Sequence, residues 1–299
     1  MFAFHLLRLP VYLWRFSTLV FLFYMACSTT TIAFKNNPLF VRNWPISKPK
    51  AVFAIVHGFG EHSGRYEHVA NFMNLNGFAV TAYDLPGHGQ TTGKRGHTDS
   101  YETLLDSVQA LLDFTQNAYP NLPIVLFGHS MGGNILANFL VRRQPALQAA
   151  VVQAPWLRLP QPPPAFELLM AKMMRNIYPS LSIDSKLNPN FVSSDPNVVA
   201  DYIKDPLNHG KITPAWFFGA FEAQQAAIEN AHKITIPTLV MHGKADQLAA
   251  ISGTEDFVKN GKKNLTYKDW EGLAHELHNE PQKEAVLRFM LDWVNERLK

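Results

Sequence analysis

The sequence predicts an α/β fold class: a doubly wound, mostly parallel sheet with an inserted helical segment. Three observations predict it. Short apolar runs of strand length alternate with helix-like segments, a pattern typical of parallel sheets covered by helices. A glycine-flanked turn at 128–132 joins one such run to a helix-like stretch. Between 156 and 235 the alternation stops, and a proline-punctuated, helix-like segment takes its place.

Six apolar runs are predicted to be strands. Each is short and nearly continuous in hydrophobic residues, which is typical of strands buried on both faces of a parallel sheet. The third run leads directly into the glycine-flanked turn. The runs lie at 52–56, 78–83, 123–127, 149–153, 238–241 and 265–267.

Three amphipathic stretches are predicted to be helices that cover this sheet. The stretch from Tyr101 to Ala118 carries its leucines, a valine and a phenylalanine on one stripe. A second helix follows the turn, from Gly133 to Gln144, and a third runs from Val286 to Leu298. We therefore expect residues 35–155 and 236–299 to form the α/β core.

Residues 156–235 are predicted to be a helical insertion, and two interpretations of it stay open. Methionines and leucines recur at helical spacing over 168–177, and aromatic residues cluster at 216–221. These stripes are either the ordinary core of a helical subdomain or the inner face of a lid that lines an acyl-chain tunnel. On the second interpretation Phe217 and Phe218 are plausible wall residues. The position of the insertion, between two core strands, favours a lid over Ser130.

The composition is that of a globular protein with a mild charge. Of 299 residues, 47% are hydrophobic, and 27 basic residues against 24 acidic ones give a net charge of +3. The basic residues are dispersed, so we expect no nucleic-acid partner. Cys27 is the single cysteine, which excludes an intrachain disulfide.

Residues 1–34 are predicted to be an N-terminal hydrophobic signal or anchor segment outside the α/β fold. Residues 16–34 carry no charge, and two arginines precede them. A basic stretch followed by an apolar one is typical of a signal peptide or a membrane anchor. Cys27 resembles the lipid-bearing cysteine of a bacterial lipoprotein signal, although Tyr24 departs from that pattern. We expect a membrane-associated or exported protein. If Met25 is the true start, we expect a cytoplasmic protein instead.

Ser130 is the candidate nucleophile. The turn reads G-H-S-M-G and stands between a predicted strand and a predicted helix, the setting in which a G-x-S-x-G motif projects its serine from a sheet edge. Small residues are needed on both sides of the serine because the neighbouring backbone crowds them. We therefore expect a very tight turn from which the serine hydroxyl projects.

A serine hydroxyl needs a base, and the base needs an orienting carboxylate. Asp246 follows one predicted strand and His275 the next, so serine, acid and base come in the order that α/β enzymes of this kind use. The rival acids are less suitable. Asp84 precedes the serine and suits a turn-stabilising role. Asp256 lies in a predicted helix and Asp269 within a strand.

No metal and no cofactor are expected. The run H-E-L-H at 275–278 is one residue short of the H-E-x-x-H zinc motif, and no third ligand is evident. The remaining requirement is a pair of backbone N–H donors for an oxyanion. Met131, after the serine, is one candidate, and Phe59, between two glycines after the first predicted strand, is the other.

Taken together, these residues resemble the monoglyceride lipase and lysophospholipase group of α/β-hydrolases. The matching motifs span about residues 50–299: HGFGEHSGRY at 57–66, YDLPGHG at 83–89, GHSMGG at 128–133, DPL at 205–207, HGKAD at 242–246 and GLAHELH at 272–278. The resemblance implies a triad of Ser130, Asp246 and His275, with Phe59 and Met131 as the oxyanion hole.

The same resemblance implies that Glu61, Arg65 and His278 line the polar, glycerol end of the pocket. Hydrogen bonds that anchor loops are the alternative role for these three residues. The chain departs from the group just after Asp246, where it reads QLAAI instead of a valine and often a proline. The hydrophobic leader is not a feature of the group either.

The expected function is that of a serine carboxylester hydrolase acting on a lipid monoester, most simply a monoacylglycerol cleaved to fatty acid and glycerol. A lysophospholipase and a general carboxylesterase or acyltransferase are the alternatives. A non-enzymatic lipid-binding protein is disfavoured, because it would need neither Ser130 nor His275. The expected partners are a lipid ester substrate and a membrane surface; the sequence does not indicate the oligomeric state.

Overall fold

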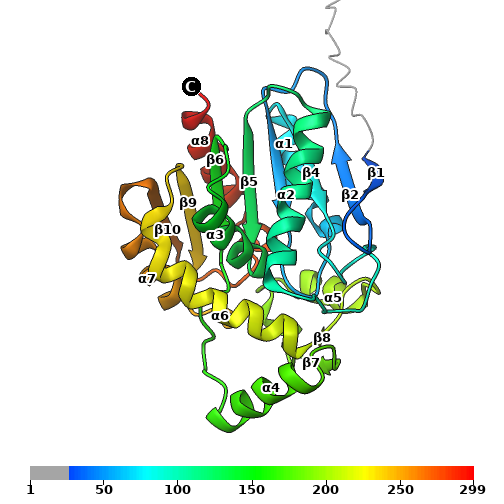
Figure 1. The fold of residues 1–299 in the computed structure, drawn as a ribbon. Coiled ribbons are helices and arrows are strands. Elements are labelled where there is room, and N and C mark those ends of the chain that lie inside the picture. The colour runs from blue at the N-terminus through cyan, green and yellow to red at the C-terminus, as the bar shows by residue number, and fades with distance from the viewer. Residues whose placement is uncertain (1–26) are drawn as a thin grey trace, which may run out of the picture.

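The computed structural model describes residues 27–299 and contains one central sheet of eight strands in the order β1-β2-β4-β3-β5-β6-β9-β10 (Figure 1). The strands from β4 to β10 along this order are all parallel, whereas β2, near one edge, runs antiparallel to both of its neighbours, β1 and β4. The predicted fold class is confirmed. The strands are β1 (Ser28–Ile32), β2 (Leu39–Trp44), β3 (Ala51–Val56), β4 (Phe78–Tyr83), β5 (Ile124–His129), β6 (Ala149–Gln153), β9 (Thr238–Gly243) and β10 (Leu265–Trp270).

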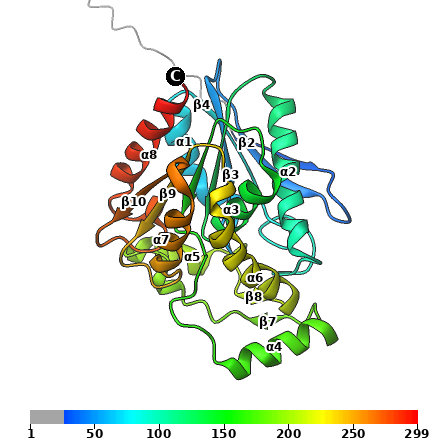
Figure 2. The same cartoon turned by 60° about the vertical axis from the view of Figure 1, so that its left-hand side comes forward.

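Helices cover both faces of this sheet (Figure 2). On one face lie α2 (Tyr101–Ala118), α3 (Met131–Arg143) and α7 (Ile251–Asn260), and on the other α1 (Glu67–Leu75) and α8 (Lys283–Arg297). The six residues of β3 are all fully buried and alternate between the two cores, which is why the strand reads as a continuous apolar run.

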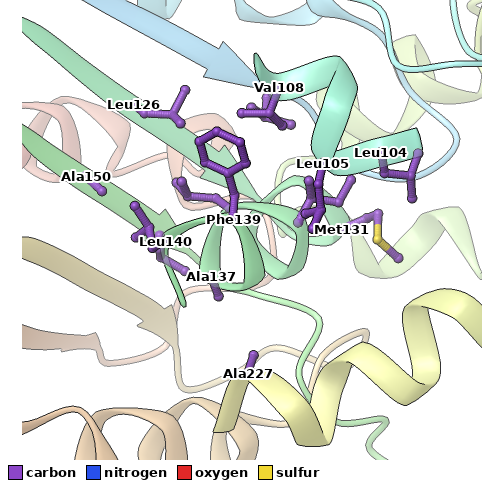
Figure 3. Packing of buried hydrophobic residues seen from close by; sticks show 14 of the residues in the cluster. Leu104, Leu105, Val108, Leu126, Met131, Ala137, Phe139, Leu140, Ala150 and Ala227 are labelled. Carbon is purple, nitrogen blue, oxygen red and sulfur yellow. The ribbon is translucent and has the colours of Figure 1, made fainter. Parts of the chain in front are cut away.

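The core beneath α3 shows how the helix after the turn is held in place (Figure 3). Phe139 is fully buried and points toward Leu126 of β5 and Val108 of α2, while Ala137 faces Ala227 of α6 (Pro214–Asn230). The predicted helix over Tyr101–Ala118 is confirmed residue for residue. Its N-cap is Ser100, whose side chain accepts a hydrogen bond from the Thr103 amide.

The N-terminal boundary of the fold differs from the prediction. Of the segment 1–34, which we expected to lie outside the fold, Ser28–Ile32 forms β1 and pairs with β2. Four of the five β1 residues are exposed, so the strand lacks the apolar run by which strands are recognised. The rest of the predicted signal or anchor, residues 1–26, lies outside the described residues. No helix within 27–299 is both long and apolar enough to cross a bilayer.

The insertion between β6 and β9 lies beyond the carboxyl ends of the parallel strands (Figure 1). It contains the predicted helices and also a small two-stranded sheet. The sequence did not predict that sheet. Its elements are α4 (Ala165–Ile177), β7 (Ile183–Asp184), α5 (Pro196–Lys204), β8 (Lys211–Ile212) and α6 (Pro214–Asn230), together with 3-10 turns at Pro189–Phe191 and Ala231–Lys233.

The two apolar stripes of the insertion have different surroundings. On α6, Trp216 and Phe218 are buried and the helix packs on α3. On α4 no residue is buried, so the interpretation of that stripe as ordinary core is wrong. Five of its seven large apolar side chains are 42–72% exposed, while Leu168 and Met174 are half-buried; the five are Phe166, Leu169, Met170, Met173 and Ile177.

Candidate active site

Ser130 occupies a strained turn between β5 and α3. Its backbone has φ +53° and ψ −113°, a region that L-residues rarely occupy and that costs about 1–3 kcal/mol. Hydrogen bonds hold this conformation. The Ser130 amide donates to the Gln153 carbonyl at 3.0 Å, and its own carbonyl accepts from the amides of Asn134 and Trp156 at 2.9 Å. The turn is therefore fixed from both sides by β6 and its following loop.

The glycines of the turn permit the close approach of α3 to the sheet. A Cβ at Gly132 would collide with the backbone carbonyl oxygen of Val56, at the end of β3. A Cβ at Gly128 would collide with the carbonyl of Gly132 itself. Glycine at both positions allows the first turn of α3 to rest against β3 and the serine to project past the end of β5.

Asp246 and His275 lie within hydrogen-bond distance, as an acid and a base of one triad must. The Nδ1 atom of His275 is 2.6 Å from Oδ2 of Asp246. The other carboxylate oxygen accepts hydrogen bonds from the amides of Leu248 and Ala249, at 2.7 and 3.0 Å. The Asp246 side chain is fully buried, and Nε2 of His242 lies 3.0 Å from Oδ2. The acid is thus oriented before any substrate arrives.

The electrostatics of this pair suit a base that becomes protonated during the reaction. Burial alone would raise the pKa of Asp246, but His275 and His242 outweigh it and hold that pKa well below its ordinary range. Burial likewise opposes protonation of His275, yet the Asp246 carboxylate raises the pKa of His275 above 6.5. Burial, followed by repulsion from His275, lowers the pKa of His129 to about 3, so this neighbour stays neutral.

The three rival acids have other partners. Asp84 accepts hydrogen bonds from the amides of Ser63 and Gln90, at 2.8 and 2.7 Å, and so stabilises the turn after β4. Asp256 lies on α7, about half exposed, beside a surface arginine. Asp269 lies in β10 with its side chain about half exposed. Of the four acids considered, Asp246 alone contacts His275.

The loop after β3 lies against the serine. A Cβ built on Gly58 would be 3.3 Å from Cβ of Ser130, so the backbone of Phe59 begins next to the candidate nucleophile. Within residues 27–299 the Phe59 amide donates to no protein acceptor. Met131 is the first residue of α3, where an amide has no helical partner. The Phe59 ring packs on Trp216 of α6, with ring centres 4.9 Å apart.

Glu61, Arg65 and Glu276 form a buried ion cluster. The sequence analysis gave Glu276 no role of its own. The Arg65 guanidinium lies 2.5 Å from Glu61 and makes two contacts with Glu276, at 2.6 and 2.7 Å. These contacts are the ones that the loop-anchoring alternative requires. No local pattern pairs Arg65 with Glu276, because 211 positions separate them.

His278 is fully buried next to the same cluster. Its Nδ1 atom is 2.6 Å from Oε1 of Gln153, and its ring stacks on Tyr66 with centres 4.8 Å apart. Burial, followed by repulsion from neighbouring histidines, holds the pKa of His278 well below 6.5. Within the described residues, no group of three or more acidic, histidine or cysteine side chains has the geometry of a metal site.

The chain is similar to known proteins over most of its length. A family model described as serine aminopeptidase, S33 matches residues 47–282. A monoacylglycerol lipase of Mycolicibacterium smegmatis is 32% identical over 252 residues, covering 84% of this chain and 90% of that protein. Phospholipase YtpA of Bacillus subtilis is 31% identical, covering 82% of this chain and 95% of that protein.

A solved structure gives the same result. The crystal structure of Paleococcus ferrophilus monoacylglycerol lipase superposes with a TM-score of 0.80 at 31% identity. The match covers 87% of this chain and 99% of that one. Most of the fold is therefore shared with a protein of this kind.

Proposed function

Because this chain belongs to the serine aminopeptidase S33 family of α/β-hydrolases, we propose that it is a serine carboxylester hydrolase that cleaves monoacylglycerol to fatty acid and glycerol. The observation that carries the proposal is the buried contact between Asp246 and His275 at the sheet edge that presents the strained Ser130. The monoacylglycerol lipases among its relatives support the choice of substrate.

In the proposed reaction, Ser130 Oγ attacks the ester carbonyl while His275 accepts its proton. The negative charge that develops on the carbonyl oxygen is stabilised by the amides of Phe59 and Met131. His275, held by Asp246, then protonates the departing glycerol oxygen. A water molecule, deprotonated by His275, attacks the acyl-enzyme and releases the fatty acid. None of these steps requires a cofactor.

The insertion would act as a lid that binds the acyl chain. Its aromatic cluster supports this role: the rings of Trp156 and Phe217 lie 6.2 Å apart, and Phe217 stacks on Phe221 at 5.7 Å. Both Phe217 and Phe221 belong to α6, the helix that also supplies Trp216 against Phe59. An acyl chain bound along these rings would end with its carbonyl near the loop at 57–60 that carries Phe59, here called the oxyanion loop.

The exposed face of α4 would contact a lipid surface. The large apolar residues of this face occupy positions 166, 169, 170, 173 and 177, a spacing that puts them on one side of a helix. Monoacylglycerols are themselves held in bilayers and micelles, so an apolar lid face would bring the enzyme to its substrate. Attachment through the N-terminal segment, including lipidation of Cys27, is a separate part of the proposal.

A hydrolysis panel tests the assignment. Monoacylglycerols should be turned over faster than lysophospholipids, diacylglycerols, p-nitrophenyl esters and an aminoacyl p-nitroanilide. Ser130→Ala should abolish every activity, by about 10⁴-fold or more in kcat, and also abolish labelling by a fluorophosphonate. A lysophospholipid preference would favour the phospholipase alternative, and an anilide preference would favour a peptidase. Undiminished labelling of Ser130→Ala would remove Ser130 from the mechanism.

A further inference from the structure

Three charged side chains are buried together beside the candidate triad. Glu61, Arg65 and Glu276 have side chains only 2%, 10% and 3% exposed. Nη1 of Arg65 contacts Oε2 of Glu61 at 2.5 Å and Oε1 of Glu276 at 2.6 Å, and Nη2 contacts Oε2 of Glu276 at 2.7 Å. Burying three charged groups carries a large desolvation penalty in the free energy of folding. The arrangement therefore needs a reason beyond stability.

Each carboxylate of the cluster is tied to a different part of the site. Oε1 of Glu61 accepts the Gly58 amide at 2.6 Å, which fixes the loop that carries Phe59. Glu276 directly follows His275, and its amide donates to the Val192 carbonyl of the insertion at 2.8 Å. Arg65 lies between the two carboxylates. It therefore connects the oxyanion loop, the loop at 271–282 that carries His275 (the base loop) and the insertion.

The cluster carries an excess of one negative charge. Burial opposes ionisation of Glu61, but Arg65 outweighs it and lowers the pKa of Glu61 to about 2, so this carboxylate is charged at neutral pH. Arg65 therefore faces two carboxylates and balances one of them. Both Glu276 and Glu61 add, after Asp246, to the raised pKa of His275.

The other polar and charged groups around His275 come from several elements. Asp246 follows β9 and is itself hydrogen-bonded to His242 of that strand. His129 ends β5, with its ring centre 4.7 Å from that of His275. His278, three residues along the base loop, lies next to His129 at 5.0 Å.

We propose that Glu276 is a positioning residue, which acts through Arg65 and Glu61 to hold His275 in register with the oxyanion loop. The unbalanced charge of the same cluster stabilises the imidazolium that His275 becomes in the transition state. This inference rests on the proposed roles of Ser130 and His275. It also gives Arg65 a task other than binding glycerol, because three of the five N–H groups of its guanidinium already point to carboxylates.

The first test compares Glu276→Gln with Glu280→Gln in the full chain. Glu280 is the matched control because it is equally buried and lies on the same loop, yet it binds Ser193, Ser194 and the Ala274 amide instead of Arg65. With p-nitrophenyl butyrate, Glu276→Gln should lower kcat about 10- to 100-fold. The acid limb of its kcat/KM profile should move toward lower pH, by about half a unit or more. Glu280→Gln should lower Tm without moving that limb.

Arg65→Lys is the second variant, and it separates position from charge. Lysine keeps the net charge of the cluster but cannot span two carboxylates with a planar fork. The acid limb should stay in place, while kcat falls on p-nitrophenyl butyrate and on monoacylglycerol alike. If Glu276→Gln does not fold, the kcat of Arg65→Lys alone tests the positioning role.

Two results would overturn the inference. An acid limb of Glu276→Gln at the wild-type pH removes the charge effect. A normal kcat of Arg65→Lys on both esters, or a higher KM confined to monoacylglycerol, removes the positioning role and returns Arg65 to glycerol binding. A failure of the proposed function can be told apart from these results. If the chain hydrolyses p-nitrophenyl butyrate through Ser130 but prefers a lipid other than monoacylglycerol, the proposed substrate is wrong, while the test of Glu276 still holds.

Discussion

At the scale of single residues, the site depends on groups that are oriented before substrate binds. Asp246 is the clearest case, since four protein groups contact its carboxylate: two amides and the imidazoles of His242 and His275. A carboxylate so placed fixes which nitrogen of His275 bears the proton and leaves the other nitrogen as the acceptor.

Asp246→Asn should therefore lower kcat by roughly 10⁴-fold with little loss of fold, because an amide favours the wrong tautomer of His275. The measurement is kcat on a soluble ester, together with a thermal melt. Asp256→Asn is the control and should remain active, since Asp256 contacts Arg158 on the surface. Nearly full activity of Asp246→Asn with a dead Asp256→Asn would mean that the acid is misassigned.

The pH profile follows from the raised pKa of His275. This residue accepts a proton only when it is neutral, so protonation on the acid side removes activity. Asp246 raises the pKa of His275 above 6.5. As the pH is lowered, kcat/KM should therefore start to fall while the pH is still above 6.5, and then drop about tenfold per pH unit. The profile is measured from pH 5 to 9 on a soluble ester. An acid limb centred below pH 6 would contradict the stated balance between Asp246 and burial.

At the scale of elements, α6 and α4 divide the insertion into a packed part and an exposed part. If the aromatic residues of α6 bind the acyl chain, kcat/KM should climb with chain length, because each buried CH₂ contributes about 0.8 kcal/mol. Phe217→Ala should flatten this increase for long chains and leave butyryl esters almost unchanged. A flat or falling profile from butyryl to lauroyl monoglyceride in the wild type would favour an esterase of small substrates.

The exposed face of α4 makes an independent prediction. Replacing Phe166 and Ile177, which are 71% and 72% exposed, by serine should weaken adsorption to monoacylglycerol-containing vesicles at least tenfold. Turnover of soluble p-nitrophenyl butyrate should not change. Leu75→Ser is the matched control, since Leu75 is 58% exposed but lies on α1. Equal vesicle binding by all of these variants would remove α4 from the lipid contact.

At the scale of the whole molecule, the last part of the predicted N-terminal segment belongs to the sheet: Ser28–Ile32 forms β1, although we expected residues 1–34 to lie outside the fold. A chain starting at Cys27 keeps β1 and should retain its kcat on a soluble ester. A chain starting at Lys35 removes β1 and exposes the edge of β2, so it should melt at lower temperature. A folded but inactive chain starting at Cys27 would show that residues 1–26 contribute to catalysis.

Fractionation of the full chain, of Cys27→Ala and of the chain starting at Cys27 distinguishes the modes of attachment. If only the truncated chain disappears from the membrane fraction, the attachment is an apolar anchor. If Cys27→Ala disappears from the membrane fraction as well, the attachment is a lipid on Cys27. A full chain that is already soluble and unprocessed would exclude both and favour Met25 as the start.

Much of this molecule follows from local sequence patterns. The continuous apolar runs, the amphipathic stretch over Tyr101–Ala118 and the glycine-flanked serine predict the sheet, α2 and the turn, because each depends on residues that are close in sequence. The chain order of Ser130, Asp246 and His275 nominates the triad for the same reason: each residue lies in the loop or turn that comes after a predicted strand. β1 could not be predicted, since it is a mostly exposed Ser-Thr strand that exists only by pairing with β2.

What the sequence by itself determined is the chain order of the six parallel strands and of helices α2, α3 and α8, the fold class, and the identity of the candidate nucleophile, acid and base. Only the tertiary structure decided what each side chain faces. The amphipathic pattern of α4 states that one side is apolar, but whether anything covers that side depends on distant elements, and nothing within 27–299 buries it. Arg65 and Glu276 likewise meet only because two loops at the same sheet edge converge, and a long-range contact of this kind leaves no periodic signal in the chain.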